Sequence, residues 1–198
     1  MLEQRIQQQF FDSADLKYQS AEALTRPIAD AVNAIVGCIT AGGKVLACGS
    51  GGSASDAQHF AAEFIGRFER ERPGLAAVAL GADSAVMSAI GDGYDYTQAL
   101  ARQVQSLGAP GDVLLAISAD GNAANVVAAV DAARARDMTV VALSGHGGGR
   151  LRERLLETDV HICVPHERAA RVQEVHLLVL HCLCDAVDLQ LLGEQDLA

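Results

Sequence analysis

The sequence is poor in aromatic and basic residues. It has no tryptophan, and aromatic residues make up 4% of its 198 positions. Its core must therefore be built from small aliphatic side chains. The 15 Lys and Arg residues are outnumbered by 25 Asp and Glu residues, which gives a formal net charge of -10. This balance disfavours a broad basic face for nucleic-acid phosphates, so we expect no direct nucleic-acid binding.

The sequence also lacks the marks of an exported or membrane protein. No apolar run approaches the ~20 residues that span a bilayer, and the opening MLEQRIQQQFF does not follow the order of a signal peptide. The five cysteines are scattered and odd in number, which indicates reduced thiols rather than a disulfide framework. We expect a cytoplasmic protein without membrane contact.

The remaining composition is that of a globular chain. Half of the residues are hydrophobic and a fifth are charged. This balance leaves no room for extended disorder. The length predicts a single domain over residues 1–198.

Five short apolar runs predict the fold class. They are nearly continuous rather than alternating, as in parallel strands that are covered on both faces. The runs are KVLACG, LAAVAL, VLLAIS, MTVVAL and VHICV. Each run precedes a Gly-rich or polar turn and a helical stretch. This rhythm predicts an α/β fold with a doubly wound, five-stranded parallel sheet, in which ligands bind at the carboxyl ends of the strands.

Helices are expected before and after these strands. Apolar spacing predicts a first helix over residues 2–24 and a second one that begins near Pro27 and ends at Gly42. The last helix, over 167–192, is apolar on most of its surface and needs cover on more than one side.

The three expected helices predict an assembly. We expect the two N-terminal helices, in residues 1–42, and the last helix to pack against other subunits in a homo-oligomer of even number. Residues 43–198 then supply the α/β core together with the last helix.

A Gly-rich turn, GSGGSASD, follows the first strand. Its glycines allow a tight turn, and Ser53 with Asp56 forms a capping-box pattern at the start of a helix. Backbone N–H groups at a helix N-terminus attract anions, although the spacing matches neither the NTPase loop nor the dinucleotide fingerprint. The turn predicts a phosphate cradle, with a purely structural turn as the alternative.

The third strand ends in a similar turn, where Ser118, Gly121 and Asn122 lead into a helix. Two such turns at the carboxyl ends of strands can face one ligand. Together they favour a site for a sugar phosphate.

His59 and Glu63 are four residues apart and share one face of a helix. An imidazole and a carboxylate at this spacing form a metal half-site or an acid/base pair, and a structural ion pair is equally compatible. The last helix adds Gln173 and His181. A histidine between Leu180 and Leu183 is unexpected without a function, because buried polar groups must be satisfied.

Three segments resemble the sugar-isomerase (SIS) domain proteins of the phosphoheptose isomerase group: GSGGSASDAQHFAAEFIGRFERERPGL, GDVLLAIS with its Gly-Asn turn, and ARVQEVHLLVLHCLCD. The resemblance extends over essentially the whole chain and implies a flavodoxin-like SIS domain in a homotetramer. Two kinds of protein share the pattern. One is an isomerase of sedoheptulose 7-phosphate, and the other is DiaA, a tetrameric scaffold that binds the replication initiator DnaA.

The resemblance implies an aldose–ketose isomerase that makes D-glycero-D-manno-heptose 7-phosphate for lipopolysaccharide by a zinc-assisted enediol mechanism. It implies one zinc per subunit on His59, Glu63, Gln173 and His181, with Glu63 and His181 as the acid/base pair. In the DiaA pattern the Glu and the final His are replaced, so their retention here favours the enzyme. A DiaA-like regulator with DnaA as its partner, or a non-catalytic sugar-phosphate sensor, is the alternative.

Other family positions depart from the isomerase pattern. The Asn-Gly-Gly-Ser loop begins with Ser50 here, and Gly93 stands where the family has an aspartate. In the phosphate turn, Ala119, Asp120 and Ala123 replace three hydroxyl residues. A carboxylate ~5 Å from a phosphate dianion is repelled by several kcal/mol at an effective dielectric constant near 20. The positions that the resemblance assigns to substrate binding are Ser50, Gly51, Gly52, Ser53, Glu63, Asp92, Gly93, Ser118, Ala119, Asp120, Ala123 and Gln173.

Overall fold

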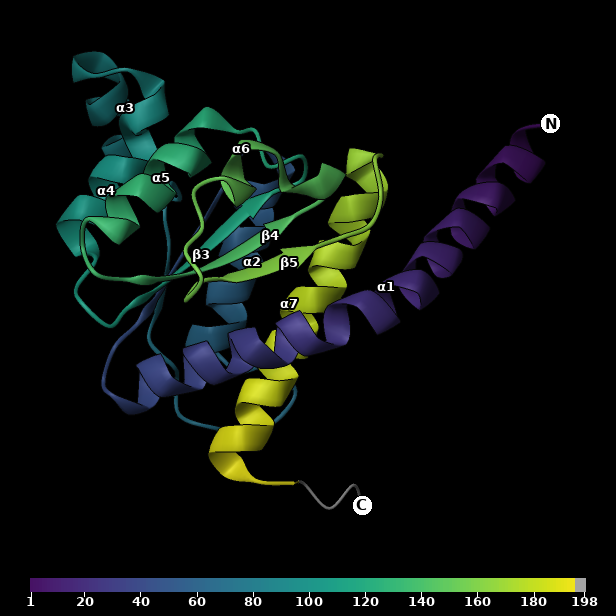
Figure 1. Ribbon diagram of the computed structural model, residues 1–198, viewed down its shortest axis with the longest axis horizontal. Coiled ribbons are helices and arrows are strands. Elements are labelled where there is room, and N and C mark those ends of the chain that lie inside the picture. The colour runs from purple at the N-terminus through teal and green to yellow at the C-terminus, as the bar shows by residue number, and fades with distance from the viewer. Residues whose placement is uncertain (195–198) are drawn as a thin grey trace.

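The computed structural model describes residues 1–194, and within them five parallel strands form one sheet (Figure 1). The strands are β1 (Val45–Gly49), β2 (Ala77–Ala79), β3 (Val113–Ser118), β4 (Thr139–Ser144) and β5 (Val160–Cys163). Their order in the sheet is β2-β1-β3-β4-β5. The strands coincide with the five apolar runs, so the predicted doubly wound sheet is confirmed.

Helices cover both faces of this sheet. They are α1 (Leu2–Thr40), α2 (Gly52–Ile65), α3 (Ser84–Gly93), α4 (Ala99–Leu107), α5 (Ala124–Arg134), α6 (Gly149–Arg152) and α7 (Ala169–Leu192), with 3₁₀ turns η1 (Tyr96–Gln98) and η2 (His146–Gly148). Side chains that alternate along β3 pack into two hydrophobic clusters, one on each face of the sheet. Val113 and Leu115 pack in the cluster that contains α1, α2 and α7, whereas Leu114 and Ala116 pack in the cluster that contains α4 and α5. Burial on both faces explains the continuous apolar runs.

The N-terminal segment is one helix, and the prediction of two helices is wrong. Pro27 lies inside α1. A proline in a helix interior removes one backbone hydrogen bond. Here the buried stripe continues on both sides of it, from Leu16 and Leu24 to Ala31 and Ile35, and packing against α7 outweighs the local break. Figure 1 shows the amino-terminal half of α1 projecting away from the sheet.

The last helix, α7, corrects the expectation that no segment could span a bilayer. By length and composition alone it is long and apolar enough. Core helices of soluble proteins meet the same criterion, and α7 packs against α1 and α2. Its buried residues are Arg171, Val172, Val175, His176, Val179, Leu180, Leu183, Cys184, Val187 and Asp188.

The single domain over residues 1–198 stays a prediction, as does its division at residue 42. Residues 195–198 lie outside the part of the chain that the structure describes.

Candidate functional site

The two turns predicted to bind phosphate lie side by side at the carboxyl edge of the sheet. Strands β1 and β3 are parallel neighbours, with Gly49 opposite Ile117. The turn that follows Gly49 and the turn that follows Ser118 therefore begin at the same edge, where ligands of such sheets bind.

The turn after β1 is shaped by its glycines. Gly51 precedes α2 with a φ of 61°, and no side chain caps the helix. Ser53 lies inside the first helical turn, so the capping-box prediction for Ser53 and Asp56 is wrong. A Cβ on Gly49 would lie 2.2 Å from the carbonyl oxygen of Ser53, so α2 packs directly on the strand end. The first amides of α2 need partners outside the helix, which suits an anion.

Asp120 folds back onto its own turn. Its Oδ1 accepts hydrogen bonds from the Asn122 backbone N–H at 2.9 Å and from the Ser118 hydroxyl at 3.3 Å. Gly121 has a φ of 70°, and a Cβ there would lie 1.9 Å from the carbonyl oxygen of Gly148. The turn is therefore held against the loop after β4, and its carboxylate occupies donors that a phosphate would use.

Ala119 and Ala123 leave this turn without the hydroxyl groups of the family pattern. Ala123 stands at the amino end of α5 without a side-chain cap. The backbone amides at this end of α5 are the donors that remain for an anion.

Helices α2 and α7 bring three of the four predicted metal ligands together, among them both predicted catalytic residues. The Nε2 atoms of His59 and His181 lie 3.0 Å apart, and Glu63 Oε1 lies 3.7 Å from His59 Nε2. Burial raises the pKa of the Cys184 thiol on α7 to about 12, and the negative charge of Glu63 adds to this shift. The carboxylate of Glu63 therefore lies close enough to α7 to affect the pKa of this thiol. Such a cluster can bind a cation or transfer protons.

Gln173 lies elsewhere along α7. A Cβ on Gly52 would lie 2.6 Å from Gln173 Nε2, so this amide packs against the Gly-rich turn. Eight residues separate it from His181, about 12 Å along the helix axis. Gln173 therefore belongs to the phosphate turn of its own chain rather than to the imidazole pair.

The donor types of the cluster fit zinc, because two imidazole nitrogens and a carboxylate are common zinc ligands. With the side chains as they stand, no group of three or more His, Cys, Asp or Glu residues within 1–194 is arranged to hold a metal ion. A tetrahedral zinc site here would need a fourth donor from outside this cluster.

Asp92 and Gly93 lie apart from the cluster. They end α3, a helix without buried residues that contacts α4 and η1. Figure 1 shows α3 at the outer edge of the molecule, beyond α4. The structure therefore does not bring this pair to the imidazoles of its own chain.

The SIS domain family model matches residues 9–145. A phosphoheptose isomerase from Methylibium petroleiphilum is 74% identical over 197 residues, which cover 100% of this chain and 98% of that relative. One from Aromatoleum aromaticum is 56% identical over 192 residues, or 97% of each chain. This chain belongs to the SIS-domain phosphoheptose isomerases.

Solved structures of the family have the same fold. The phosphoheptose isomerase GmhA from Neisseria gonorrhoeae matches with a TM-score of 0.91 at 45% identity, covering 95% of this chain and 99% of that one. The phosphoheptose isomerase from Francisella tularensis matches with a TM-score of 0.92 at 41% identity, covering 95% and 98%. The SIS fold therefore extends along nearly the whole chain.

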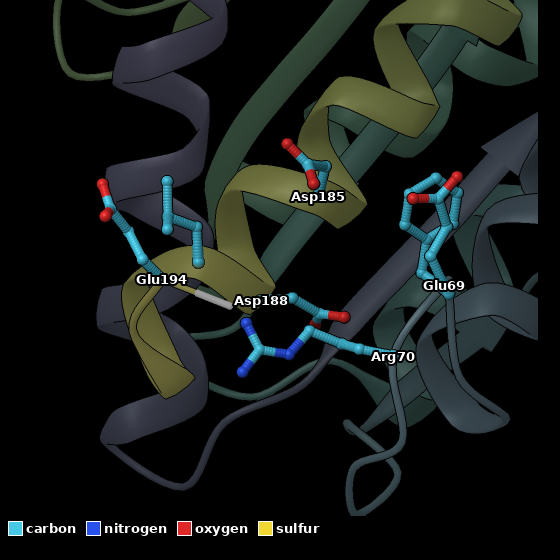
Figure 2. Close-up of a pocket in the computed structure, with 7 residues that line it drawn as sticks. Glu69, Arg70, Asp185, Asp188 and Glu194 are labelled. Carbon is cyan, nitrogen blue, oxygen red and sulfur yellow. The ribbon is translucent and has the colours of Figure 1, made fainter. Parts of the chain in front are cut away.

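A cavity of about 380 Å³ in this SIS-domain protein lies next to the imidazole pair. One of its walls is Phe68, whose ring centroid lies 5.5 Å from that of His181. Figure 2 shows Asp185 and Asp188 projecting from α7. They face Glu69 and Arg70, which belong to the segment that follows α2. The lining residues are Phe68, Glu69, Arg70, Asp185, Asp188, Leu189 and Glu194.

Sequence reasoning missed three residues near the cluster. Asp56 lies one turn before His59, and burial raises its pKa while His59 opposes this shift. Its Oδ2 is buried without a hydrogen-bond partner in the described part of the chain. Phe68 and Arg72 belong to a segment that folds back on α2. Spacing to His59 could have indicated Asp56, but nothing local indicates the other two.

Proposed function

We propose that this protein converts sedoheptulose 7-phosphate to D-glycero-D-manno-heptose 7-phosphate, a step toward the heptose of lipopolysaccharide. The contact of His59 with His181, beside the carboxylate of Glu63, carries the proposal. The full-length similarity to proteins named phosphoheptose isomerase supports it.

The reaction needs a base and an acid on adjacent carbons. Glu63 removes a proton from C1 of the ketose while His181 donates a proton to the carbonyl oxygen at C2, which yields an enediol. Glu63 then returns its proton to C2, and His181 takes the O1 proton as the aldehyde forms. The contact of His181 with His59, whose Nε2 atoms lie 3.0 Å apart, places the His181 imidazole beside Glu63.

We propose that His59, Glu63, Gln173 and His181 would hold one zinc ion per subunit. Gln173 and His181 are eight residues apart on one helix, so we propose that the site lies where neighbouring chains meet and complete it. A zinc ion held there would supply Lewis-acid polarisation of the substrate oxygens.

The phosphate of the substrate binds at the two turns. Ser53, Ser118 and the amides at the starts of α2 and α5 supply donors for it. The Asp120 carboxylate moves off the Ser118 hydroxyl when the phosphate binds.

The active form is a homotetramer in the cytoplasm. Apolar side chains on the outside of α1 and α7 support the assembly, since an exposed patch of this kind marks an interface. They are Leu2, Ile6, Phe10, Phe11, Leu177 and Leu178. Free cysteine thiols suit a reducing compartment. A DnaA-binding regulator and a non-catalytic sensor are the alternatives to this function, and both are untested.

An assay with the purified, zinc-loaded protein tests the activity. Incubation with sedoheptulose 7-phosphate should produce the aldoheptose 7-phosphate. A failure to form this product with metal present contradicts the proposal and leaves a binding role.

Metal analysis tests the zinc site. We expect about one zinc per chain in the wild type and almost none in His59→Ala, because the imidazole supplies one ligand. His166→Ala, which removes a histidine outside the cluster, is the matched control and should keep its zinc. Equal zinc contents in wild type and His59→Ala would contradict the assignment.

A further inference from the structure

The guanidinium of Arg72 joins the carboxyl end of α2 to α7. Its Nε donates to Asp188 Oδ1 at 2.6 Å, and its Nη2 donates to the carbonyl oxygen of Glu63 at 3.0 Å. Its Nη1 donates to the carbonyl oxygen of Phe64 at 2.9 Å. The last carbonyls of a helix lack partners within it, so Arg72 satisfies two of them. The Arg72 and Asp188 side chains are 1% and 3% exposed.

These contacts surround the catalytic cluster. Glu63 is the proposed base, and Asp188 follows His181 on α7 by seven residues, two helical turns along the same face. The segment that carries Arg72 also carries Phe68, whose ring lies against the His181 ring. The Arg72 side chain therefore connects the backbone of Glu63, the proposed base, to α7, the helix that carries His181.

We propose that Arg72 is a positioning residue for the isomerisation, an inference that rests on the proposed function. Its planar fork holds α2 and α7 at the separation that keeps Glu63 and His59 next to His181. The Arg72 guanidinium reaches four acceptors in fixed directions, the fourth being the Pro73 carbonyl oxygen at 3.2 Å from Nη1, and an ammonium group does not reproduce this.

The buried charge of Asp188 is compensated by its ion pair with Arg72. Its Oδ2 is buried and has no hydrogen-bond partner in the described part of the chain, so Arg72 is the group that offsets its charge. Arg72→Lys keeps the positive charge near Asp188 and loses the fork. This variant therefore separates charge compensation from positioning better than a neutral substitution.

A control variant reports on stability alone. Asp112 accepts a hydrogen bond from the Lys44 ammonium, and the two form a 2.6 Å ion pair at the opposite, amino edge of the sheet. The Asp112 side chain is 3% exposed, so Asp112→Asn also weakens a buried ion pair, but far from the cluster.

Kinetics of the two folded variants test the proposal. We expect both to lose thermal stability. In Arg72→Lys, kcat should fall by about a hundredfold, the cost of a misplacement near 1 Å, while KM stays within about threefold. In Asp112→Asn, kcat should stay at the wild-type value. An Arg72→Lys variant with the kcat of this control overturns the proposal.

Crystal structures of wild type and Arg72→Lys give a readout that does not depend on activity. In the variant the His59 and His181 Nε2 atoms should lie beyond hydrogen-bond distance, more than about 3.5 Å apart. An unchanged 3.0 Å separation overturns the positioning role. If the wild type does not isomerise the heptose phosphate, the proposed function fails, and this separation still decides the role of Arg72.

Discussion

The Asp120 carboxylate already occupies donors that a phosphate needs. It accepts from the Ser118 hydroxyl and the Asn122 amide, so a phosphate must displace it and then bind near its charge. If a phosphate binds at this turn, the Asp120 carboxylate should therefore lower substrate affinity.

Asp120→Ser should bind sedoheptulose 7-phosphate at least about tenfold more tightly, because it removes a negative charge and adds a hydroxyl donor. Isothermal titration calorimetry measures the change. Glu157→Ser removes an exposed carboxylate just before β5, at the amino edge of the sheet, and should leave affinity unchanged. Equal or weaker binding by Asp120→Ser would mean that its carboxylate does not oppose the phosphate.

Residue patterns predicted part of the site. The four-residue spacing of His59 and Glu63 is local, so it could be interpreted without a structure. The contact of His59 with His181 joins positions 122 apart, and here the resemblance to the family supplied what spacing could not. The place of Gln173 depends on packing against Gly52, and the role of Arg72 depends on how a loop folds back. Neither has a local signal.

Helices and strands were predicted unequally well. The strands were found because burial on both faces leaves an unbroken apolar run. The predicted helix break at Pro27 was wrong because α1 packs against α7 and has buried residues on both sides of the proline. The helix-breaking propensity of Pro27 is outweighed by the packing of α1 against α7.

His176 joins α7 to β4 and makes this packing sensitive to pH. It is fully buried, and its Nε2 lies 3.1 Å from the carbonyl oxygen of Ser144. Burial lowers its pKa to about 4 from its usual value of 6.5. Between these two values the unfolded chain binds a proton that the folded chain does not, so stability falls as the pH falls through this window.

We expect His176 to cost the wild type about 2 kcal/mol of unfolding free energy between pH 7 and pH 5. His176→Gln retains an amide donor for Ser144 and lacks this titration. Urea unfolding of both proteins at the two pH values, at one protein concentration, measures the difference. Parallel pH dependence in the two proteins would show that His176 is not the titrating group.

At the scale of the whole molecule, the proposed assembly of chains would complete the proposed site. The cluster on α2 and α7 lacks a fourth metal donor, Gln173 lies against the Gly-rich turn, and the projecting half of α1 exposes Phe10 at 72% and Leu2 at 71%. Association of chains would cover these apolar side chains and bring donors from one subunit to the cluster of another.

Mixed assemblies test a shared site. Glu63 and His181 meet His59 within one chain, so the informative pair is Glu63→Ala and Gln173→Ala, which should each be nearly inactive alone. If Gln173 of one chain completes the cluster of another, subunit exchange between the variants should restore up to about a quarter of the wild-type activity, in line with catalysis that needs both groups in one site. Exchange shown by mass spectrometry without recovered activity would place both groups on one chain.

The proposed role of Glu63 as the base of an aldose–ketose isomerisation can be measured as the rate of aldoheptose 7-phosphate formation from sedoheptulose 7-phosphate. Wild type, Glu63→Gln and Glu69→Gln should be compared at equal zinc loading, since Glu69 is a nearby carboxylate that lines the neighbouring cavity. We expect product from the wild type, a rate lower by about a hundredfold or more in Glu63→Gln, and a nearly unchanged rate in Glu69→Gln. A Glu63→Gln variant as fast as the wild type would contradict this role.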